Sequence, residues 1–296
     1  MSARARFSSH QTSHNPSPAV KSLEAKPIIK PTTRLSQQNL KMLAKEFLAL
    51  AKQPRDLLAK LQDLVESTPE SSADFGVDSG VLIVGLGNPG EKYACNRHNV
   101  GFMVLDRLCE ALGGSWEAVP KFRADLAVLP SHNTCPLARF TRCYLLKPQT
   151  FMNLSGESVG AFARFYKISC ILVVHDELDI PFGALRYKLG GSSGGHNGLK
   201  SIDAHISDHL GGNSYARLRF GIGDPSLHKP YDVAGFVLGD FLPAQGDELG
   251  ALITHAMLGA LFFACTRDFA ATQNFFTKAA PSKAPEVAPK SLGEER

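Results

Sequence analysis

The sequence lacks the cysteine patterns that bind zinc or cross-link a secreted domain. Its 296 residues include six cysteines, with no CxxC pair and no short Cys/His spacing. Neither a zinc site nor a disulfide framework is indicated, and we expect a reducing compartment. No apolar run approaches the roughly 20 residues that span a membrane, so no membrane partner is expected. With 44% hydrophobic and 20% charged residues, the composition is that of an ordinary globular protein.

Acidic residues are scarce at the N-terminus. Residues 1–35 are rich in Ser, Arg, Lys and Pro, and their only acid is Glu24. This composition is typical of a mitochondrial or chloroplast transit peptide, and a disordered tail is an equal alternative. We therefore expect an organellar protein, with a cytoplasmic one as the alternative. The formal net charge of +4 is compatible with a polyanionic partner without requiring one.

Changes in composition divide the chain into four regions. Residues 1–35 form the disordered or targeting segment. Residues 36–79 form a helical extension and linker, with helical spacing over 36–66 that is interrupted at Pro54. Residues 80–280 form the main domain, and the Ala-, Pro-, Lys- and Glu-rich residues 281–296 are expected to be a disordered tail.

The main domain alternates buried strands with amphipathic helices. We expect strands near 81–84, 126–129, 143–147, 170–176 and 216–223, and helices over 99–112, 155–166 and within 243–277. This alternation predicts an α/β fold. The expected architecture is a single-domain three-layer sandwich, with a mixed, partly parallel sheet flanked by helices.

Three motifs resemble nucleotide-binding or esterase signatures, and each is incomplete. "GLGNPG" (85–90) has the glycine spacing of a dinucleotide site, but the helix signal starts only near Asn99 and no acid ends the next strand. "GGSSG" (190–194) matches a nucleophile elbow, yet the following "GHNG" would start a helix poorly, so we expect a flexible glycine loop. "ILVVHDE" (171–177) lacks the phosphate loop that an ATPase metal strand requires.

Polar residues follow three of the predicted strands. Ligands of open α/β sheets bind at the carboxyl ends of strands, so His98, Asn153 and Asp176 could converge there. A His that titrates near neutrality, an Asp that orients it and amide donors form a hydrolytic set that activates water. The alternative is that these residues serve only in turns, helix caps or on the surface.

Five blocks in the same order resemble the bacterial-type peptidyl-tRNA hydrolase family over about residues 80–278. They are "VGLGNPGEKYACNRHNVGFMVLD", "LLKPQTFMNLSGESVGAF", "VVHDELDIPFGALRYKLGGSSGGHNGLKSI", "ARLRFGIGDP" and "VAGFVLGDF". The resemblance implies a monomer that hydrolyses the ester bond between peptide and tRNA, with water as the nucleophile. Peptidyl-tRNA is the implied RNA substrate, and no metal or organic cofactor is implied.

The resemblance implies roles for nine residues. The catalytic set is His98 as general base, Asp176 as the acceptor that holds the His98 tautomer, and Asn153 as the group that binds the carbonyl and positions water. The implied substrate-binding residues are Asn88 and Asn197 for the peptide, Met152 and Tyr93 along the groove, and Lys188 and Arg219 for tRNA phosphates. Neither of the two cations has an obvious local acid, so we expect both to be unpaired.

Two features depart from the family's pattern. The link "FYKISCILVV" is short, which affects where the strand starts but should leave Asp176 in place. The N-terminal extension of 80 residues has no counterpart in the bacterial enzymes. Some plant relatives act as organellar RNA-splicing factors, so a non-catalytic RNA-binding role in intron splicing is the alternative. The presence of all five residues His98, Asp176, Asn153, Asn88 and Asn197 favours the enzyme.

Overall fold

A seven-stranded mixed sheet runs through the protein. The computed structural model describes residues 36–50, 80–129, 142–223 and 232–280. The strand order is β2-β3-β4-β1-β5-β7-β6. The central strands are parallel to one another: β4 (Cys143–Pro148), β1 (Val81–Gly85), β5 (Cys170–Glu177) and β7 (Ala216–Gly221). The outer strands are antiparallel to their neighbours: β2 (Glu117–Val119), β3 (Ala124–Val128) and β6 (Leu185–Leu189).

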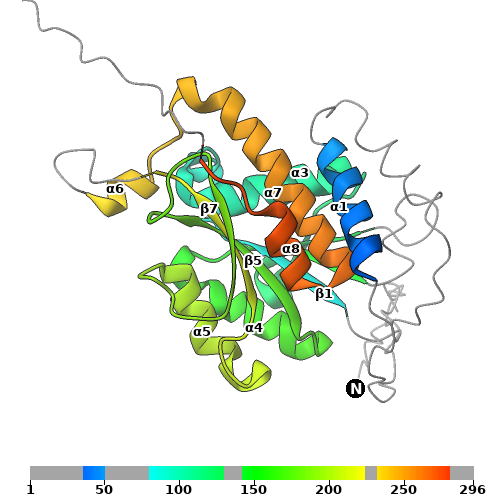
Figure 1. The fold of residues 1–296 in the computed structure, drawn as a ribbon. Coiled ribbons are helices and arrows are strands. Elements are labelled where there is room, and N and C mark those ends of the chain that lie inside the picture. The colour runs from blue at the N-terminus through cyan, green and yellow to red at the C-terminus, as the bar shows by residue number, and fades with distance from the viewer. Residues whose placement is uncertain (1–35, 51–79, 130–141, 224–231, 281–296) are drawn as a thin grey trace, which may run out of the picture.

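Helices cover both faces of this sheet (Figure 1). One face carries α3 (Val100–Ala111), α7 (Gly246–Thr266) and α8 (Phe269–Phe276), and the other carries α4 (Ser155–Tyr166) and α5 (Asn197–Leu210). Side chains alternate along β1. Ile83 packs in the core under α3, α7 and α8, whereas Leu82 and Val84 pack in the core under α4 and α5. The expected three-layer sandwich with a mixed sheet is therefore confirmed.

The N-terminal helix α1 (Gln37–Leu50) packs against the main domain beside α7 (Figure 1). Leu40, Ala44 and Phe47 are at most 2% exposed, and the Phe47 ring meets Phe262 edge-on with centroids 5.8 Å apart. The helix predicted over 36–66 is thus seen over 37–50. Its remainder lies outside the described residues, as do segment 1–35, the linker 67–79 and the tail 281–296.

Most predicted elements agree with the structure to within a few residues, but the prediction after the glycine loop was wrong. α5 begins at Asn197, because the His196 side chain accepts hydrogen bonds from the backbone N–H groups of Gly198 and Leu199. A capping side chain compensates for the poor local propensity of the glycines. Sequence reasoning also missed β2, β6 and the short helix α6 (Val233–Val237).

Close packing explains the glycines of "GLGNPG". A Cβ on Gly85 would lie 2.4 Å from the carbonyl oxygen of Gly101 in α3, and a Cβ on Gly87 would lie 2.8 Å from the Phe102 ring. Gly90 has φ +101°, a conformation that favours glycine. The first helix after the motif that is long enough to bind a pyrophosphate, α3, begins only at Val100. Gly85 and Gly87 therefore let α3 approach the sheet, and Gly90 lets the chain turn. This agrees with the expectation that the motif does not form a dinucleotide site.

One helix in the described part of the chain, Pro243–Thr266, is long and apolar enough to cross a membrane by length and composition. The expectation that no segment has this character was too strict. Its most apolar window is 61% buried inside the protein, and residues such as Met257 and Leu261 are fully buried in the core. Burial on several sides explains the apolar sequence, as it does for the core helix of a globular domain.

Candidate active site

The turns after three parallel strands meet at one edge of the sheet. The chain after β1 leads into η3 (Arg97–Asn99), which carries His98. The chain after β4 leads into η6 (Met152–Leu154), which carries Asn153. Asp176 is the penultimate residue of β5. Because β1, β4 and β5 are parallel, their carboxyl ends face the same side.

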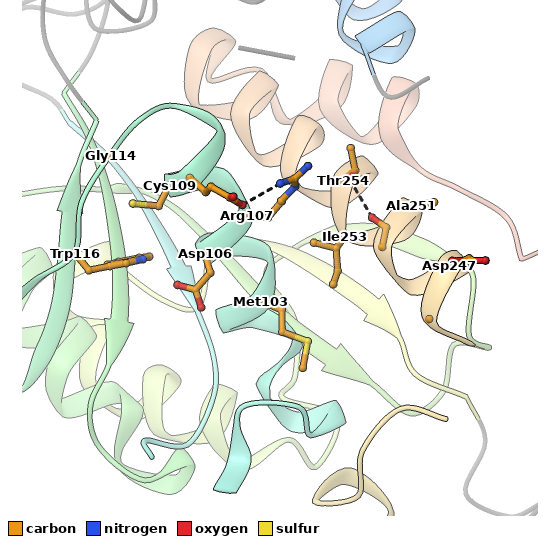
Figure 2. Close-up of a pocket in the computed structure, with 13 residues that line it drawn as sticks. Met103, Asp106, Arg107, Cys109, Gly114, Trp116, Asp247, Ala251, Ile253 and Thr254 are labelled. Carbon is orange, nitrogen blue, oxygen red and sulfur yellow. Dashed lines mark hydrogen bonds and ion pairs between the residues drawn. The ribbon is translucent and has the colours of Figure 1, made fainter. Parts of the chain in front are cut away.

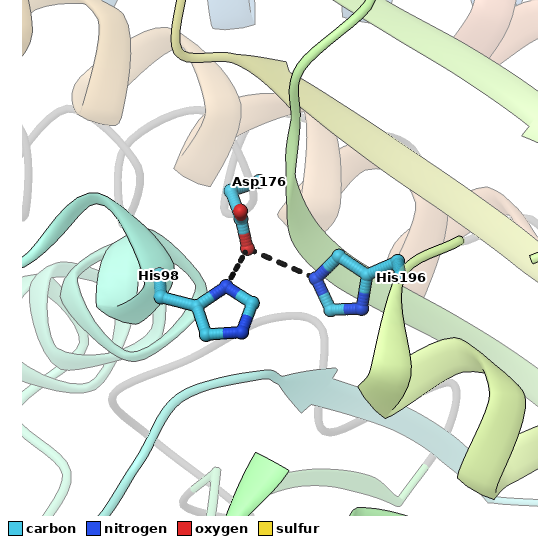
Figure 3. A group of neighbouring side chains, drawn as sticks. All are labelled: His98, Asp176 and His196. Carbon is cyan, nitrogen blue, oxygen red and sulfur yellow. Dashed lines mark hydrogen bonds and ion pairs between the residues drawn. The ribbon is translucent and has the colours of Figure 1, made fainter. Parts of the chain in front are cut away.

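Asp176 lies at the centre of this edge, where one of its oxygens contacts two histidines (Figure 3). His98 Nδ1 and His196 Nε2 each lie 2.9 Å from Asp176 Oδ1. The Asp176 side chain is only 2% exposed. Burial by itself would raise the pKa of Asp176, but the charge interactions and hydrogen bonds of the two histidines outweigh it and lower the pKa. The carboxylate is therefore ionised at neutral pH.

His98 has one nitrogen engaged and one available. Its Nδ1–H donates to Asp176, and no described residue forms a hydrogen bond to its Nε2. Burial lowers the pKa of His98, but the charge of Asp176 and the hydrogen bond between them raise it by more, so the net pKa lies above the usual 6.5. An imidazole with a free Nε2 and a carboxylate behind it is the arrangement of a general base.

His196 is a site residue that sequence reasoning missed. Its Nδ1 accepts from the backbone N–H groups of Gly198 and Leu199, at 3.1 Å and 3.3 Å. That nitrogen must carry a lone pair, so the proton is on Nε2 and is donated to Asp176. The family resemblance implies a role for its neighbour Asn197 and not for His196. The signal that could have identified His196 was a polar residue immediately before a helix start.

A third imidazole, His175, closes the back of the site. It is 1% exposed, and its Nδ1–H donates to the backbone carbonyl of Asp176 at 2.8 Å. Its ring packs edge-on against His196, with centroids 5.0 Å apart. Burial, followed by the proximity of His196, lowers the pKa of His175 to about 3. His175 is therefore a neutral ring packed against His196.

The Asn88 amide has a fixed orientation. Its Oδ1 accepts the backbone N–H of Met152 at 2.9 Å, which leaves the Nδ2 donors for another partner. Asn99 holds the Asn88 backbone on both sides, accepting its N–H and donating to its carbonyl, both at 2.9 Å. The turn after β1 is thereby tied to the start of η6. Because the Asn88 Oδ1 is held by Met152, the direction of the two N–H groups on Asn88 Nδ2 is fixed as well.

The start of α5 packs against η6. A Cβ on Gly198 would lie 2.5 Å from Met152 Sδ, so any larger residue would make the Met152 side chain shift. Asn153 and Asn197, which follow and precede this touching pair, are both exposed. Met152 is 4% exposed beneath them. Two exposed amides flanking a buried thioether form a surface that a peptide backbone can contact. Tyr93, in η2 (Glu91–Tyr93), is half-buried on the turn after β1.

A buried arginine anchors the glycine loop that precedes α5. Arg217 is 2% exposed and donates to the backbone carbonyls of Gly191 and Ser192, at 2.7 Å and 2.6 Å. Its guanidinium also reaches Asp203 of α5, at 3.3 Å. The loop is thus held rather than free, which corrects the expectation of a flexible loop. No described histidine contacts Ser192, so the esterase-like spacing does not create a nucleophile.

The three side chains His98, Asp176 and His196 are close enough to be tested as a metal site, because their ligand atoms lie within 4.8 Å of one another. A metal would require a lone pair on His196 Nε2 and hence a proton on Nδ1. That proton would face the two backbone N–H donors that cap α5. The residues therefore do not fit a resident metal ion.

The two predicted tRNA-binding cations differ in their surroundings. Lys188, on the edge strand β6, is exposed and has no ion pair with any described residue. Arg219, on β7, donates through Nε to Glu177 at 2.8 Å. The expectation that Arg219 has no acid to pair with was wrong, because the strand pairing brings β5 and β7 together from distant parts of the sequence.

A cavity of about 1010 Å³ lies elsewhere, between α3 and the first half of α7 (Figure 2). Its walls include Met103, Asp106, Trp116 and Ile253. It is open to solvent and shares no residue with the His98–Asp176–His196 group. No histidine is among the described residues that line it, so these residues do not form a His-based hydrolytic set.

Comparisons with known proteins agree on one family. A family model described as peptidyl-tRNA hydrolase matches residues 82–284. Peptidyl-tRNA hydrolase of Helicobacter hepaticus is 45% identical over 183 residues, which cover 62% of this chain and 75% of that protein. Peptidyl-tRNA hydrolase of Brucella ovis is 47% identical over 178 residues, covering 58% of this chain and 66% of that protein.

Solved structures give the same result. Peptidyl-tRNA hydrolase from Acinetobacter baumannii superposes with a TM-score of 0.59 at 36% identity, covering 68% of this chain and 96% of that one. A complex of peptidyl-tRNA hydrolase with n-propanol has a TM-score of 0.60 at 36% identity, covering 70% and 98%. Helix α1 lies outside the residues that the family model matches.

Proposed function

The chain belongs to the peptidyl-tRNA hydrolase family, and from that membership we propose that it hydrolyses the ester bond of peptidyl-tRNA and releases free tRNA for reuse. One observation carries the chemistry proposed here. His98 has an ionised carboxylate at 2.9 Å behind its Nδ1, and its Nε2 has no partner among the described residues. A base of this kind can deprotonate water without a Ser or Cys nucleophile.

The proposed reaction begins with a water molecule beside His98 Nε2. As its oxygen attacks the ester carbonyl carbon, its proton passes to Nε2, and the carboxylate of Asp176 stabilises the imidazolium. We assign Asn153 to the carbonyl oxygen, where an amide donor stabilises developing negative charge. When the tetrahedral intermediate collapses, the ester bond breaks and the imidazolium returns the proton to the ribose oxygen. The products are a peptide with a free carboxyl group and tRNA with a free hydroxyl group.

Substrate binding is assigned to the groups around this centre. We assign the Nδ2 donors of Asn88 and the exposed amide of Asn197 to the peptide backbone, and the buried Met152 to the lining of the groove. Tyr93 is assigned to the groove near the terminal adenosine of the tRNA. Lys188 and Arg219 are assigned to tRNA phosphates, because only long cations reach a phosphate from the rim of a groove.

The test is direct hydrolysis. The purified full-length chain is incubated with N-acetylated aminoacyl-tRNA, and release of free tRNA is measured beside a His98→Gln variant. We expect turnover by the wild type and a loss of about 10²- to 10⁴-fold in the variant. If both folded proteins bind the RNA and neither hydrolyses it, the non-catalytic role in RNA splicing replaces the enzyme.

Two further assignments concern assembly and location. We propose that the protein acts as a monomer, as the family resemblance implies, and light scattering tests this. We also propose that residues 1–35 direct the protein to a mitochondrion or chloroplast, on the strength of their Arg- and Ser-rich, acid-poor composition. A fluorescent reporter fused to residues 1–40 tests it, and a diffuse cytosolic signal would reject it.

A further inference from the structure

A surface at the far end of α4 carries exposed aromatic rings that the hydrolytic site does not use. Phe165 is 57% exposed and Tyr166 is 38% exposed, although the helical pattern places Tyr166 on the inward face. Their rings meet edge-on with centroids 5.0 Å apart. Both rest on buried aromatic residues, since Phe162 lies 4.6 Å from Tyr166 and Phe122 lies 5.6 Å from Phe165. The two exposed rings are therefore held in place on a rigid base.

Positive charge surrounds these rings. Lys121 Nζ lies 3.3 Å from the centre of the Phe165 ring. Burial raises the pKa of Tyr166, and Arg142 is close enough to oppose that rise with its charge. Lys167 follows Tyr166 at the end of α4, and Arg123 lies beside the first turn of the helix, where it pairs with Glu157. Among the described residues, Lys121, Arg142 and Lys167 have no ion pair.

Two of these cations occupy backbone positions that favour glycine. Lys167 has φ +54° and Arg123 has φ +50°, and each ends a helix in the left-handed region. A non-glycine residue is strained there. The chain thus places one long cation directly after Phe122 and another directly after Tyr166, at positions where a glycine would be less strained. We call Lys121, Arg123, Arg142, Phe165, Tyr166 and Lys167 the α4 strip.

We propose that the α4 strip binds an unpaired stretch of RNA. Exposed rings provide surfaces on which successive bases stack, and the cations around them neutralise the phosphates that join those bases. Duplex RNA offers phosphates but keeps its bases stacked inside, so it would use the cations and not the rings. An acidic protein segment would neutralise the cations, but it offers no flat bases to stack on both rings.

The strip is separate from the hydrolytic site. α4 begins at Ser155, two residues after Asn153, and Phe165 lies ten residues further along, about 15 Å at 1.5 Å per residue. No member of the strip belongs to the site described above. The proposal therefore adds a second RNA contact to the proposed function, and it can fail while hydrolysis stands.

The experiment measures binding of a fluorescent 12-nucleotide oligouridine to the full-length chain. Phe165→Leu keeps an apolar side chain without the ring, and we expect it to weaken binding about 10-fold, within the range for loss of one stacked base. Lys121→Ala should flatten the plot of log affinity against log salt by about 0.7. The matched control is Met42→Ala with Lys45→Ala on α1, where an equally exposed apolar residue and a cation lie near each other on the surface.

Five outcomes separate the interpretations. The proposal stands if Phe165→Leu loses oligouridine affinity, keeps its thermal midpoint and still hydrolyses peptidyl-tRNA. It is overturned if Phe165→Leu binds oligouridine as the wild type does, or if it loses affinity for a 12-base-pair RNA duplex by the same factor. It is also overturned if the α1 control loses as much affinity. Oligouridine binding that disappears in Lys188→Ala instead would place this RNA at the hydrolytic site.

Discussion

Two loops bring a histidine to the same oxygen of Asp176, and they leave these histidines with different capabilities. In η3, His98 donates through Nδ1 and retains a free Nε2. At the start of α5, His196 donates through Nε2, and its Nδ1 is occupied by two backbone N–H groups. The two rings lie 5.1 Å apart and share one acceptor (Figure 3). Only His98 can accept a proton from water without breaking an existing contact.

The comparison shows that residue type does not assign a role in this cluster. The role of each histidine depends on the ring nitrogen that does not contact Asp176, because a general base needs a lone pair that no other donor occupies. His196 instead joins the α5 N-terminus to the carboxylate, and so positions Asp176. The following changes test this difference between the two loops, beginning with the largest expected effect.

The largest effect is expected from His98→Gln. Glutamine retains a polar side chain of similar length but cannot accept a proton near neutral pH. We expect kcat to fall about 10²- to 10⁴-fold, with little change in the dissociation constant for tRNA. Single-turnover hydrolysis and fluorescence binding measure the two quantities. A variant that keeps nearly full hydrolysis would show that His98 is not the base.

Asp176→Asn should have an effect between wild type and His98→Gln, because it removes the charge and leaves the ring of the base. The Asp176 charge is what raises the pKa of His98 against the opposing effect of burial. Without the charge, burial remains and the pKa of His98 falls below 6.5. The rising limb of kcat/KM against pH should therefore move to lower pH, with a lower plateau. An unmoved limb would mean that the titrating group is not His98.

His175 extends the comparison to a third ring, with no role in proton transfer. Burial holds its pKa near 3 in the folded protein, against 6.5 in the unfolded chain. The unfolded chain therefore binds the extra proton first, and stability falls as the pH drops below 6.5. A slope of up to about 1.4 kcal/mol per pH unit is expected between pH 6 and 4.5.

Urea unfolding of the wild type and of His175→Leu, which fills the buried position with a side chain that cannot titrate, measures this slope. His98 contributes only a small slope of opposite sign in that range, because its pKa is raised in the folded protein and both states become protonated as the pH falls below 6.5. In the variant, the free energy of unfolding should therefore change less steeply with pH, by the slope that corresponds to the uptake of one proton. Equal slopes in the two proteins would indicate that His175 is not held neutral.

His196 should have a smaller effect, which a pair of variants can divide. His196→Ala removes the helix cap and the contact with Asp176, so we expect a loss of about 1 kcal/mol of stability together with reduced kcat. His196→Asn retains a good capping residue but is too short to reach Asp176, so stability should be kept while kcat still falls. Thermal unfolding and kcat are measured for both. If His196→Asn matches the wild type in kcat, the contact with Asp176 has no part in catalysis.

The smallest effect is expected for the two cations, where the same distinction between occupied and free groups applies. Lys188 is free of ion pairs in the described structure, whereas Arg219 is paired with Glu177. Lys188→Ala should reduce the salt slope of tRNA binding by about 0.7 to 0.9, and Arg219→Ala by less, because releasing Glu177 leaves an unpaired acid. Filter binding at several salt concentrations measures the slopes. A larger change for Arg219→Ala would reverse the assignment.

Several features of the fold were predictable because they depend on local sequence. The buried run of β1, the 3–4 spacing of α3 with Phe102 and Leu105, and the late helix start after "GLGNPG" all follow from the order of nearby residues. β6 and α5 were not predicted. β6 is a short edge strand with a mixed pattern, and α5 starts at glycines whose poor propensity is compensated by a single histidine side chain.

The sequence by itself determined the fold class, the family and the candidates His98, Asp176 and Asn153, because strand periodicity and motif order are properties of the chain. Only the tertiary structure decided which contacts those candidates make. Asp176 is 78 residues from His98 and 20 from His196, and Arg219 is 42 residues from Glu177. Contacts between such distant residues depend on how strands pair and helices pack. Only the tertiary structure therefore defines the tautomer of His196, the pairing of Arg219 and the exposure of Phe165.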